Sequence, residues 1–125
     1  MTTRKRLPKK RKSHQTQARI DGHKLYITMG EYPDGMLGEV FLDMHKVGAT
    51  FRGMMHCFAQ LLSIALQYGV PLRVIVSTFR GREFEPCGEV VGHPRIEKAT
   101  SLVDYVVRCL ACEYLDEKEP EDETT

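Results

Sequence analysis

Cysteine and histidine side chains offer the most direct route to chemistry in this chain of 125 residues. Cys109 and Cys112 form a C-x-x-C pair, a spacing found in many zinc sites and redox-active disulfides. The pair falls inside a segment that we predict to be helical, whereas a zinc site usually places it on a turn and needs two further ligands. We therefore favour two buried thiols that pack as small apolar side chains. A metal site or a redox pair is the alternative.

Three other side chains are candidates for contact with a ligand or a partner. His45 precedes Lys46 at the end of a predicted strand, where it could contact a phosphate or a partner. Glu85 and Cys87 flank Pro86 in a stretch rich in Gly and Pro, and loops of this kind often carry functional residues. We expect Cys87 to be the most reactive thiol. The alternative interpretation is an exposed connection at His45 and a structural turn at Glu85 and Cys87.

A cluster of cations near the N-terminus could bind phosphate groups. Seven basic side chains and no acidic ones lie between residues 4 and 12, namely Arg4, Lys5, Arg6, Lys9, Lys10, Arg11 and Lys12. Such a run could contact nucleic acid or a nucleotide through charge. No aromatic residue is interleaved with the cations to stack on bases. We therefore expect any such binding to be weak and independent of sequence, and a solvated linker is the alternative.

The two ends of the chain carry opposite charge. Residues 116–125 contain six acidic side chains and one lysine, while the whole chain has a net charge of +1. We predict a flexible basic arm over residues 1–14, one domain over 15–115 and a disordered acidic tail over 116–125. No apolar run approaches the roughly 18–20 residues that cross a membrane, and no apolar segment follows the basic start as in a secretory signal. We expect a cytoplasmic protein with reduced cysteines.

Alternation of apolar and polar residues predicts three strands between residues 15 and 45. The second and third have apolar side chains at every other position: Leu25, Ile27, Met29, Val40, Leu42 and Met44. Asp21-Gly22 and the segment 32–35 have the composition of tight turns, because Gly and Asp tolerate positive φ angles and Pro33 presets φ. These segments predict a three-stranded antiparallel meander.

From residue 50 onward the apolar period changes to 3.6, which predicts helices over 50–68, 71–79 and 101–115. The first has a broad apolar stripe that we expect to face the core: Phe51, Met54, Met55, Phe58, Leu61, Leu62, Ala65 and Leu66. Ser101 can cap the third, with Asp104 three residues later as in a capping box. Residues 80–95 read as an irregular loop. The predicted class is α+β, a three-stranded antiparallel meander packed against about three helices.

Six segments occur in an order that resembles a known family. They are HKLY at 23–26, GEYPDG at 30–35, LGEVFLDMHK at 37–46, LQYGVPL at 66–72, FEPCG at 84–88 and ATSLVDY at 99–105. Together they resemble the C-terminal region of adenosylcobalamin-dependent (class II) ribonucleoside-diphosphate reductases, beyond the catalytic barrel. This region is a domain named for a Thr-Ser-Cys-Pro-Asp (TSCPD) signature. Thr100, Ser101 and Asp104 keep three of its residues, whereas Leu102 and Val103 replace Cys and Pro.

The resemblance implies that catalysis takes place elsewhere. In this family the cobalamin site, the radical-forming cysteine, the redox cysteine pair and the substrate-phosphate loops belong to the barrel, which has no counterpart in residues 1–125. We find no Gly-rich phosphate loop, Ser-His-Asp arrangement or spaced carboxylate pair, so we assign no catalytic, cofactor-binding or metal residue. We expect no cofactor to bind this chain alone, and adenosylcobalamin to serve the parent enzyme.

The expected function is therefore that of a stand-alone C-terminal domain of a B12-dependent ribonucleoside-diphosphate reductase. It would contribute to ribonucleotide reduction for DNA synthesis as an accessory, assembly or split-enzyme component, with a reductase catalytic polypeptide as its partner. The alternative is a nucleic-acid or nucleotide-binding adaptor that uses the basic arm. A remnant without a reductase contact is the third possibility.

Overall fold

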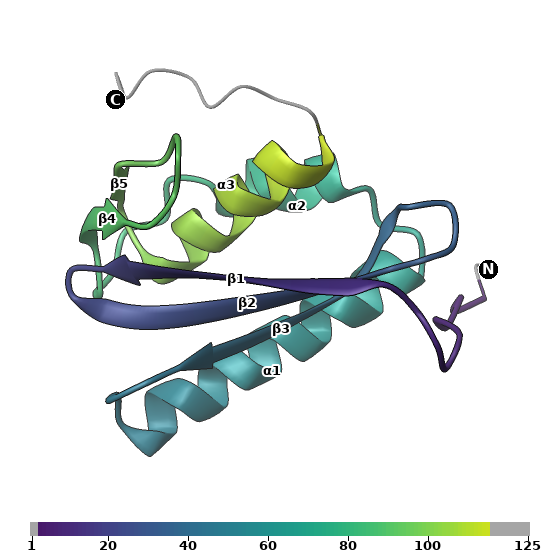
Figure 1. The fold of residues 1–125 in the computed structure, drawn as a ribbon, viewed down its shortest axis with the longest axis horizontal. Coiled ribbons are helices and arrows are strands. Elements are labelled where there is room, and N and C mark those ends of the chain that lie inside the picture. The colour runs from purple at the N-terminus through teal and green to yellow at the C-terminus, as the bar shows by residue number, and fades with distance from the viewer. Residues whose placement is uncertain (1–2, 116–125) are drawn as a thin grey trace. The chain divides into compact units, whose positions relative to one another are not determined.

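The computed structural model describes residues 3–115, so the predicted acidic tail over 116–125 lies outside the described residues. Strands and helices follow in the order β1 (Ser13–Ile20), β2 (His23–Glu31), β3 (Leu37–Met44), α1 (Ala49–Gln67), α2 (Leu72–Phe79), β4 (Gly88–Val91), β5 (Lys98–Ala99) and α3 (Leu102–Tyr114). The predicted α+β class is confirmed (Figure 1). Within the described residues, no helix is long and apolar enough to cross a membrane.

The strands form a sheet in the order β3-β2-β1-β4-β5. Its first three strands are the predicted meander, whereas β4 lies in the segment that we expected to be an irregular loop. β4 pairs antiparallel with the end of β1, with Ile20 opposite Val90. This pairing joins residues far apart in the chain, so no local pattern predicts it. The tight turn between β1 and β2 has positive φ angles at Asp21 and Gly22, as expected.

The chain forms two compact units. Unit 1 comprises the residues up to Gln17 together with Lys24–Pro71, and unit 2 comprises Ala18–His23 together with the residues from Leu72 onward. β2, β3 and α1 therefore belong to unit 1, and α2, β4, β5 and α3 belong to unit 2.

In unit 1 the register of β2 and β3 aligns their apolar positions. Leu25 lies opposite Met44, Ile27 opposite Leu42 and Met29 opposite Val40, and all six side chains are buried. Because side chains alternate between the two faces of a strand, these residues share one face. The other face carries Tyr26, Thr28, Phe41 and Asp43.

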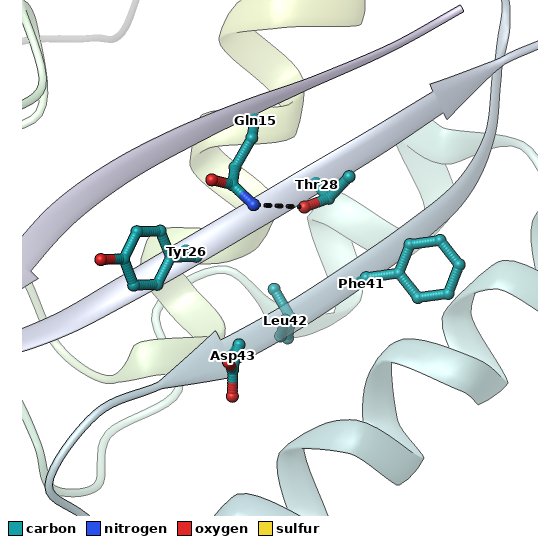
Figure 2. Close-up of a pocket in the computed structure, with 6 residues that line it drawn as sticks. All are labelled: Gln15, Tyr26, Thr28, Phe41, Leu42 and Asp43. Atoms are coloured by element: carbon teal, nitrogen blue, oxygen red, sulfur yellow. Dashed lines mark hydrogen bonds between the residues drawn. The ribbon is translucent and has the colours of Figure 1, made fainter. Parts of the chain in front are cut away.

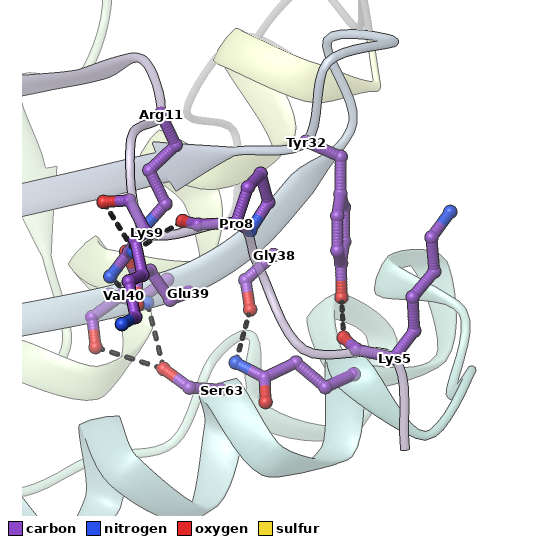
Figure 3. A network of polar contacts seen from close by, with 10 residues as sticks. Lys5, Pro8, Lys9, Arg11, Tyr32, Gly38, Glu39, Val40 and Ser63 are labelled. Carbon is purple, nitrogen blue, oxygen red and sulfur yellow. Dashed lines mark hydrogen bonds and ion pairs between the residues drawn. The ribbon is translucent and has the colours of Figure 1, made fainter. Parts of the chain in front are cut away.

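α1 runs beside β3 (Figure 1) and hydrogen-bonds to its backbone. The Ser63 hydroxyl accepts a hydrogen bond from the Val40 N–H at 2.8 Å, and the Gln67 amide donates to the Gly38 carbonyl at 3.0 Å (Figure 3). The Arg52 guanidinium donates to the Met44 carbonyl at 2.7 Å. β3 forms one edge of the sheet. An edge strand has unpaired backbone groups to which other chains can bind. Polar side chains of α1 bind the backbone of β3 at Gly38, Val40 and Met44.

In unit 2, α3 packs against α2 and is buried along most of its length. Every residue from Leu102 to Ala111 is buried, including Asp104 and Arg108. The predicted cap is confirmed, because the Ser101 hydroxyl accepts a hydrogen bond from the Asp104 N–H at 3.0 Å.

In unit 1, the predicted core face of α1 is wrong at two positions, since Met54 and Leu61 are exposed.

Candidate functional site

The three retained signature residues form a hydrogen-bond network at the start of α3, in which Ser101 and Asp104 are buried and Thr100 is exposed. The Asp104 carboxylate accepts hydrogen bonds from the Gly81 N–H at 2.7 Å and the Thr100 N–H at 3.1 Å. It also forms an ion pair with Arg108 at 2.9 Å. Asp104 is 2% exposed and Arg108 is 6% exposed. A buried carboxylate needs such partners, because removing a charge from water is costly.

This network fixes the backbone of unit 2 around α3. The Thr100 hydroxyl donates to the Arg82 carbonyl at 2.9 Å, and the Phe84 N–H donates to the Thr100 carbonyl at 3.1 Å. Arg108 also donates to the Lys98 carbonyl, at 2.7 Å. Both oxygens of the Asp104 carboxylate therefore accept hydrogen bonds from groups of the protein. This network anchors a loop and a short strand to α3, and the carboxylate at its centre is almost fully buried.

His45 lies on the surface of unit 1 beside an aromatic ring. Its imidazole is 5.0 Å from the ring of Tyr26, measured between centroids, and the Lys24 ammonium lies 5.4 Å from the centre of the same ring. A cation over an aromatic face is attracted by the ring quadrupole. The sequence singled out His45 but did not indicate that Tyr26 and Lys24 would accompany it.

A shallow hollow lies next to this cluster on the polar face of β1, β2 and β3. Its volume is about 270 Å³, and it is lined by Gln15, Tyr26, Thr28, Phe41, Leu42 and Asp43 (Figure 2). The Gln15 amide donates to the Thr28 hydroxyl at 3.0 Å. Asp43 lies 3.7 Å from Arg52 and 3.6 Å from His56. Gln15, Thr28 and Asp43 thus already contact other side chains of unit 1, which leaves few polar groups of the lining to orient a small ligand.

Glu85 and Cys87 lie in unit 2, where they flank Pro86 before β4 begins. Glu85 is exposed and Cys87 is half-buried, and the peptide bond between Glu85 and Pro86 is cis. Within the described residues, no group of three or more His, Cys, Asp or Glu side chains could hold a metal ion. The reactivity that we expect of Cys87 stays a prediction.

Cys109 and Cys112 lie on α3, as predicted for a C-x-x-C pair within a helix. Cys109 is buried and Cys112 is half-buried. One turn earlier, burial raises the pKa of the Tyr105 phenol above its usual range, and the neighbouring Cys109 raises it further. Cys109 thus lies beside a phenol that is kept neutral.

The basic arm contacts the rest of unit 1 at several points that the sequence did not indicate (Figure 3). The Lys5 N–H donates to the Gln67 carbonyl at 2.8 Å, and the Arg4 guanidinium donates to the Gln67 side chain at 2.7 Å. The Tyr32 hydroxyl donates to the Lys5 carbonyl, and the Lys5 ammonium lies 4.7 Å from the centre of the Tyr32 ring. Burial raises the pKa of Tyr32, and the charge of Arg4 opposes this shift.

Two glycines make room for the arm. A side chain at Gly38 would come within 2.7 Å of the Tyr32 ring and 3.0 Å of Leu7. A side chain at Gly30 would come within 2.3 Å of the Glu39 carboxylate. Because Gly30 is small, Glu39 can reach Arg11 and form two hydrogen bonds with its guanidinium, at 2.5 and 3.1 Å. The other cations of the arm, Arg6, Lys9, Lys10 and Lys12, are exposed.

Comparison with known proteins matches residues 1–114 to the TSCPD domain. The chain is 50% identical over 112 residues to a vitamin B12-dependent ribonucleotide reductase of Agrobacterium fabrum, covering 90% of this chain and 9% of the relative. It is 48% identical over 115 residues to the enzyme of the same name from Bradyrhizobium diazoefficiens, which covers 92% of this chain and 9% of that enzyme. The enzyme of the same name from Streptantibioticus cattleyicolor is 47% identical over 112 residues, which covers 90% of this chain and 18% of that enzyme. No solved structure matches.

The matched region includes every described strand and helix. It ends where α3 ends, at Tyr114, and contains the network of Thr100, Ser101 and Asp104. The chain spans less than a fifth of each of these reductases. The resemblance noted in the sequence is therefore confirmed at the level of the domain, and the chain belongs to the TSCPD domain family.

Proposed function

We propose that this chain takes part in ribonucleotide reduction for DNA synthesis, in the cytoplasm, together with the catalytic polypeptide of a vitamin B12-dependent reductase. It would act as a stand-alone accessory, assembly or split-enzyme component. One observation carries the proposal: the chain is 50% identical to a reductase across 90% of its own length, yet this region is only 9% of that reductase. Because the matched region is so small a part of the relative, most of that reductase lies outside it and can contain the catalytic site.

The chemistry of the described residues supports a role without catalysis by the chain alone. A radical reaction needs substrate, cofactor and reducing thiols to converge in a shielded site. The hollow on the sheet of unit 1 is shallow, and its Gln15 and Thr28 side chains pair with each other. It does not fit a corrin. We therefore expect adenosylcobalamin, which supplies the radical, to bind the catalytic polypeptide.

The test is a reconstitution with the reductase of Agrobacterium fabrum from which the matched region has been removed. Deoxynucleotide formation is measured with adenosylcobalamin and a dithiol, with ribonucleoside diphosphates and triphosphates in separate reactions. We expect no product from this chain alone, and an increase in product when it is added to the truncated reductase. We further expect the diphosphates to be the substrates.

Product formed by this chain alone would overturn the accessory role. The absence of both binding and stimulation, with a full-length Agrobacterium fabrum reductase that is active in parallel, would overturn the reductase assignment. A chain carrying Asp104→Ala is a further comparison, because we expect loss of the buried network to destabilise unit 2 and so to reduce the stimulation.

A further inference from the structure

An apolar stripe on α1 faces away from the protein core. Met54 is 64% exposed, Leu61 is 67% exposed and Tyr68, which follows the last residue of α1, is 46% exposed. These three residues are seven positions apart, and a helix brings such positions to the same side. Cys57, also exposed, lies three residues after Met54. We call these four residues the α1 outer stripe.

The surroundings of the stripe lack the charges of an ordinary solvated helix. From Gly53 to Leu72 the sequence contains no Asp, Glu, Lys or Arg. Surface helices usually carry charged residues on the face that meets water. The centres of protein interfaces, in contrast, are depleted of charge and enriched in Met and aromatic residues. The composition of the stripe is that of an interface.

The core does not account for this composition, because a different side of α1 provides it. Met55, Ala59, Leu62, Ser63 and Gln67 are the buried residues of the helix. Ser63 and Gln67 also hydrogen-bond to β3, at 2.8 Å and 3.0 Å. The helix is therefore already anchored without Met54 or Leu61.

We infer that the α1 outer stripe is the surface that docks on the reductase catalytic polypeptide, an inference that rests on the proposed function. In the relatives from Agrobacterium fabrum and Streptantibioticus cattleyicolor, the matched region is 9% and 18% of the protein. In each of these relatives, the rest of the polypeptide is much larger than the matched region and is part of the same chain. It therefore offers a large surface on which the domain could dock. Apolar residues at seven-residue spacing fit between the side chains of a partner helix, so the occupant is an apolar, helical surface of that polypeptide.

The test measures binding of the full chain to the Agrobacterium fabrum reductase that lacks its matched region. The variants are Met54→Glu and Leu61→Glu, and the control is Met36→Glu, whose native side chain is 65% exposed in unit 1 outside α1. We expect each stripe variant to weaken binding by at least about tenfold, because a charge would be buried at an apolar contact. We expect the control to bind within about twofold of wild type, as surface substitutions usually do. Thermal melts check that all variants are folded.

Alkylation of Cys57 provides a second measurement that needs no substitution. We expect the truncated reductase to slow the reaction of the Cys57 thiol with N-ethylmaleimide, read by peptide mass spectrometry, while the reaction of Cys87 keeps its rate. Wild-type binding that both stripe variants retain, without protection of Cys57, would overturn the stripe and leave the proposed function intact. Absence of wild-type binding would overturn both. A wild-type dimer that Leu61→Glu converts to monomers would show that a second copy covers the stripe, and would overturn the assigned occupant.

Discussion

At the scale of single residues, the signature that names the family divides into two structural roles. Thr100, Ser101 and Asp104 provide hydrogen bonds that hold the start of α3. Leu102 and Val103 stand where the signature has Cys and Pro, and both are buried in the core. The polar part of the signature thus supplies hydrogen bonds at the start of α3, and the two replaced positions supply apolar packing.

Replacement of Asp104 by Ala should therefore be strongly destabilising. It would remove the carboxylate that pairs with the buried Arg108 and leave the Gly81 and Thr100 N–H groups without this acceptor. We expect a loss of about 3–5 kcal/mol in the free energy of unfolding, the usual cost of breaking a buried ion pair. Denaturant melts measure this loss. Asp43→Ala is the control, because its exposed contacts at 3.6 and 3.7 Å should contribute less than about 1 kcal/mol. Equal losses would contradict the role of the network.

Tyr105 should make the stability of the protein depend on alkaline pH. Burial raises its pKa in the folded state above the ordinary tyrosine value of 10.0. Below that pH the phenol is neutral in both states, so its contribution is fully present. As pH rises further, the unfolded chain loses the proton first, and stability falls by up to about 1.4 kcal/mol per pH unit. Tyr105→Phe should reduce this fall in melts at pH 9 and 11. Identical slopes for wild type and variant would contradict the prediction.

At the scale of strands and helices, local sequence patterns predict the elements whose partners are near in the chain. The alternation around Leu25, Ile27 and Met29 predicts β2, and Ser101 marks the start of α3. β4 could not be predicted, because Val90 pairs with Ile20 and the strand has only four residues. The stripe of α1 was predicted too wide. A 3.6-residue period identifies an apolar helix, but it does not distinguish the side that packs on β3 from a side left for another protein.

The adjacent leucines of α1 provide a test of this distinction. Leu62 is buried and Leu61 is exposed. We expect Leu62→Ala to lower the free energy of unfolding by about 2–5 kcal/mol, through lost transfer energy and a cavity. Val106→Ala on α3 should act in the same way, because Val106 is fully buried. Leu61→Ala should change stability by less than about 0.5 kcal/mol. A Leu62→Ala melt that matches Leu61→Ala would contradict the packing of α1.

Sequence patterns identified the candidate site residues less well than the fold. The sequence indicates His45 as a candidate because it stands at a predicted strand end before Lys46. Its neighbour in space, Tyr26, lies on β2 and is not indicated by the sequence. The hollow formed by Gln15, Thr28 and Phe41 also depends on the strand order, which sets residues from three strands side by side. Arg11 pairs with Glu39, and the Glu39 side chain has room for its position because Gly30 has no side chain. Each of these contacts is set by register and by small residues, which composition does not reveal.

At the scale of the whole molecule, the basic arm has two separable groups of cations. Arg4, Lys5 and Arg11 contact the rest of unit 1, through Tyr32, Glu39 and Gln67. Arg6, Lys9, Lys10 and Lys12 are exposed and could bind phosphate without giving up these contacts. Stability and phosphate binding should therefore respond to different substitutions within the same short segment.

Deletion of residues 1–12 should abolish any binding of DNA and also lower the stability of unit 1, because it removes both groups. A chain with Lys9, Lys10 and Lys12 replaced by Ala should lose the binding but keep its stability. Arg11→Ala should lower stability, since Glu39 would remain largely buried without its partner. Fluorescence anisotropy with single- and double-stranded oligonucleotides, measured over a range of salt concentrations, and denaturant melts separate the two effects.

The salt dependence of DNA binding distinguishes a weakly binding charged arm from a nucleic-acid adaptor. Binding by counterion release falls steeply with salt, with a slope of about −0.7 to −0.9 in log K against log salt for each phosphate contact. We expect weak binding of this kind, equal for all sequences, because no aromatic residue lies among the cations to stack on bases. The arm would then speed the approach of a charged partner more than it would hold one. Tight binding that persists at high salt, or that survives deletion of residues 1–12, would instead favour a nucleic-acid adaptor and would require a second contact surface on the domain.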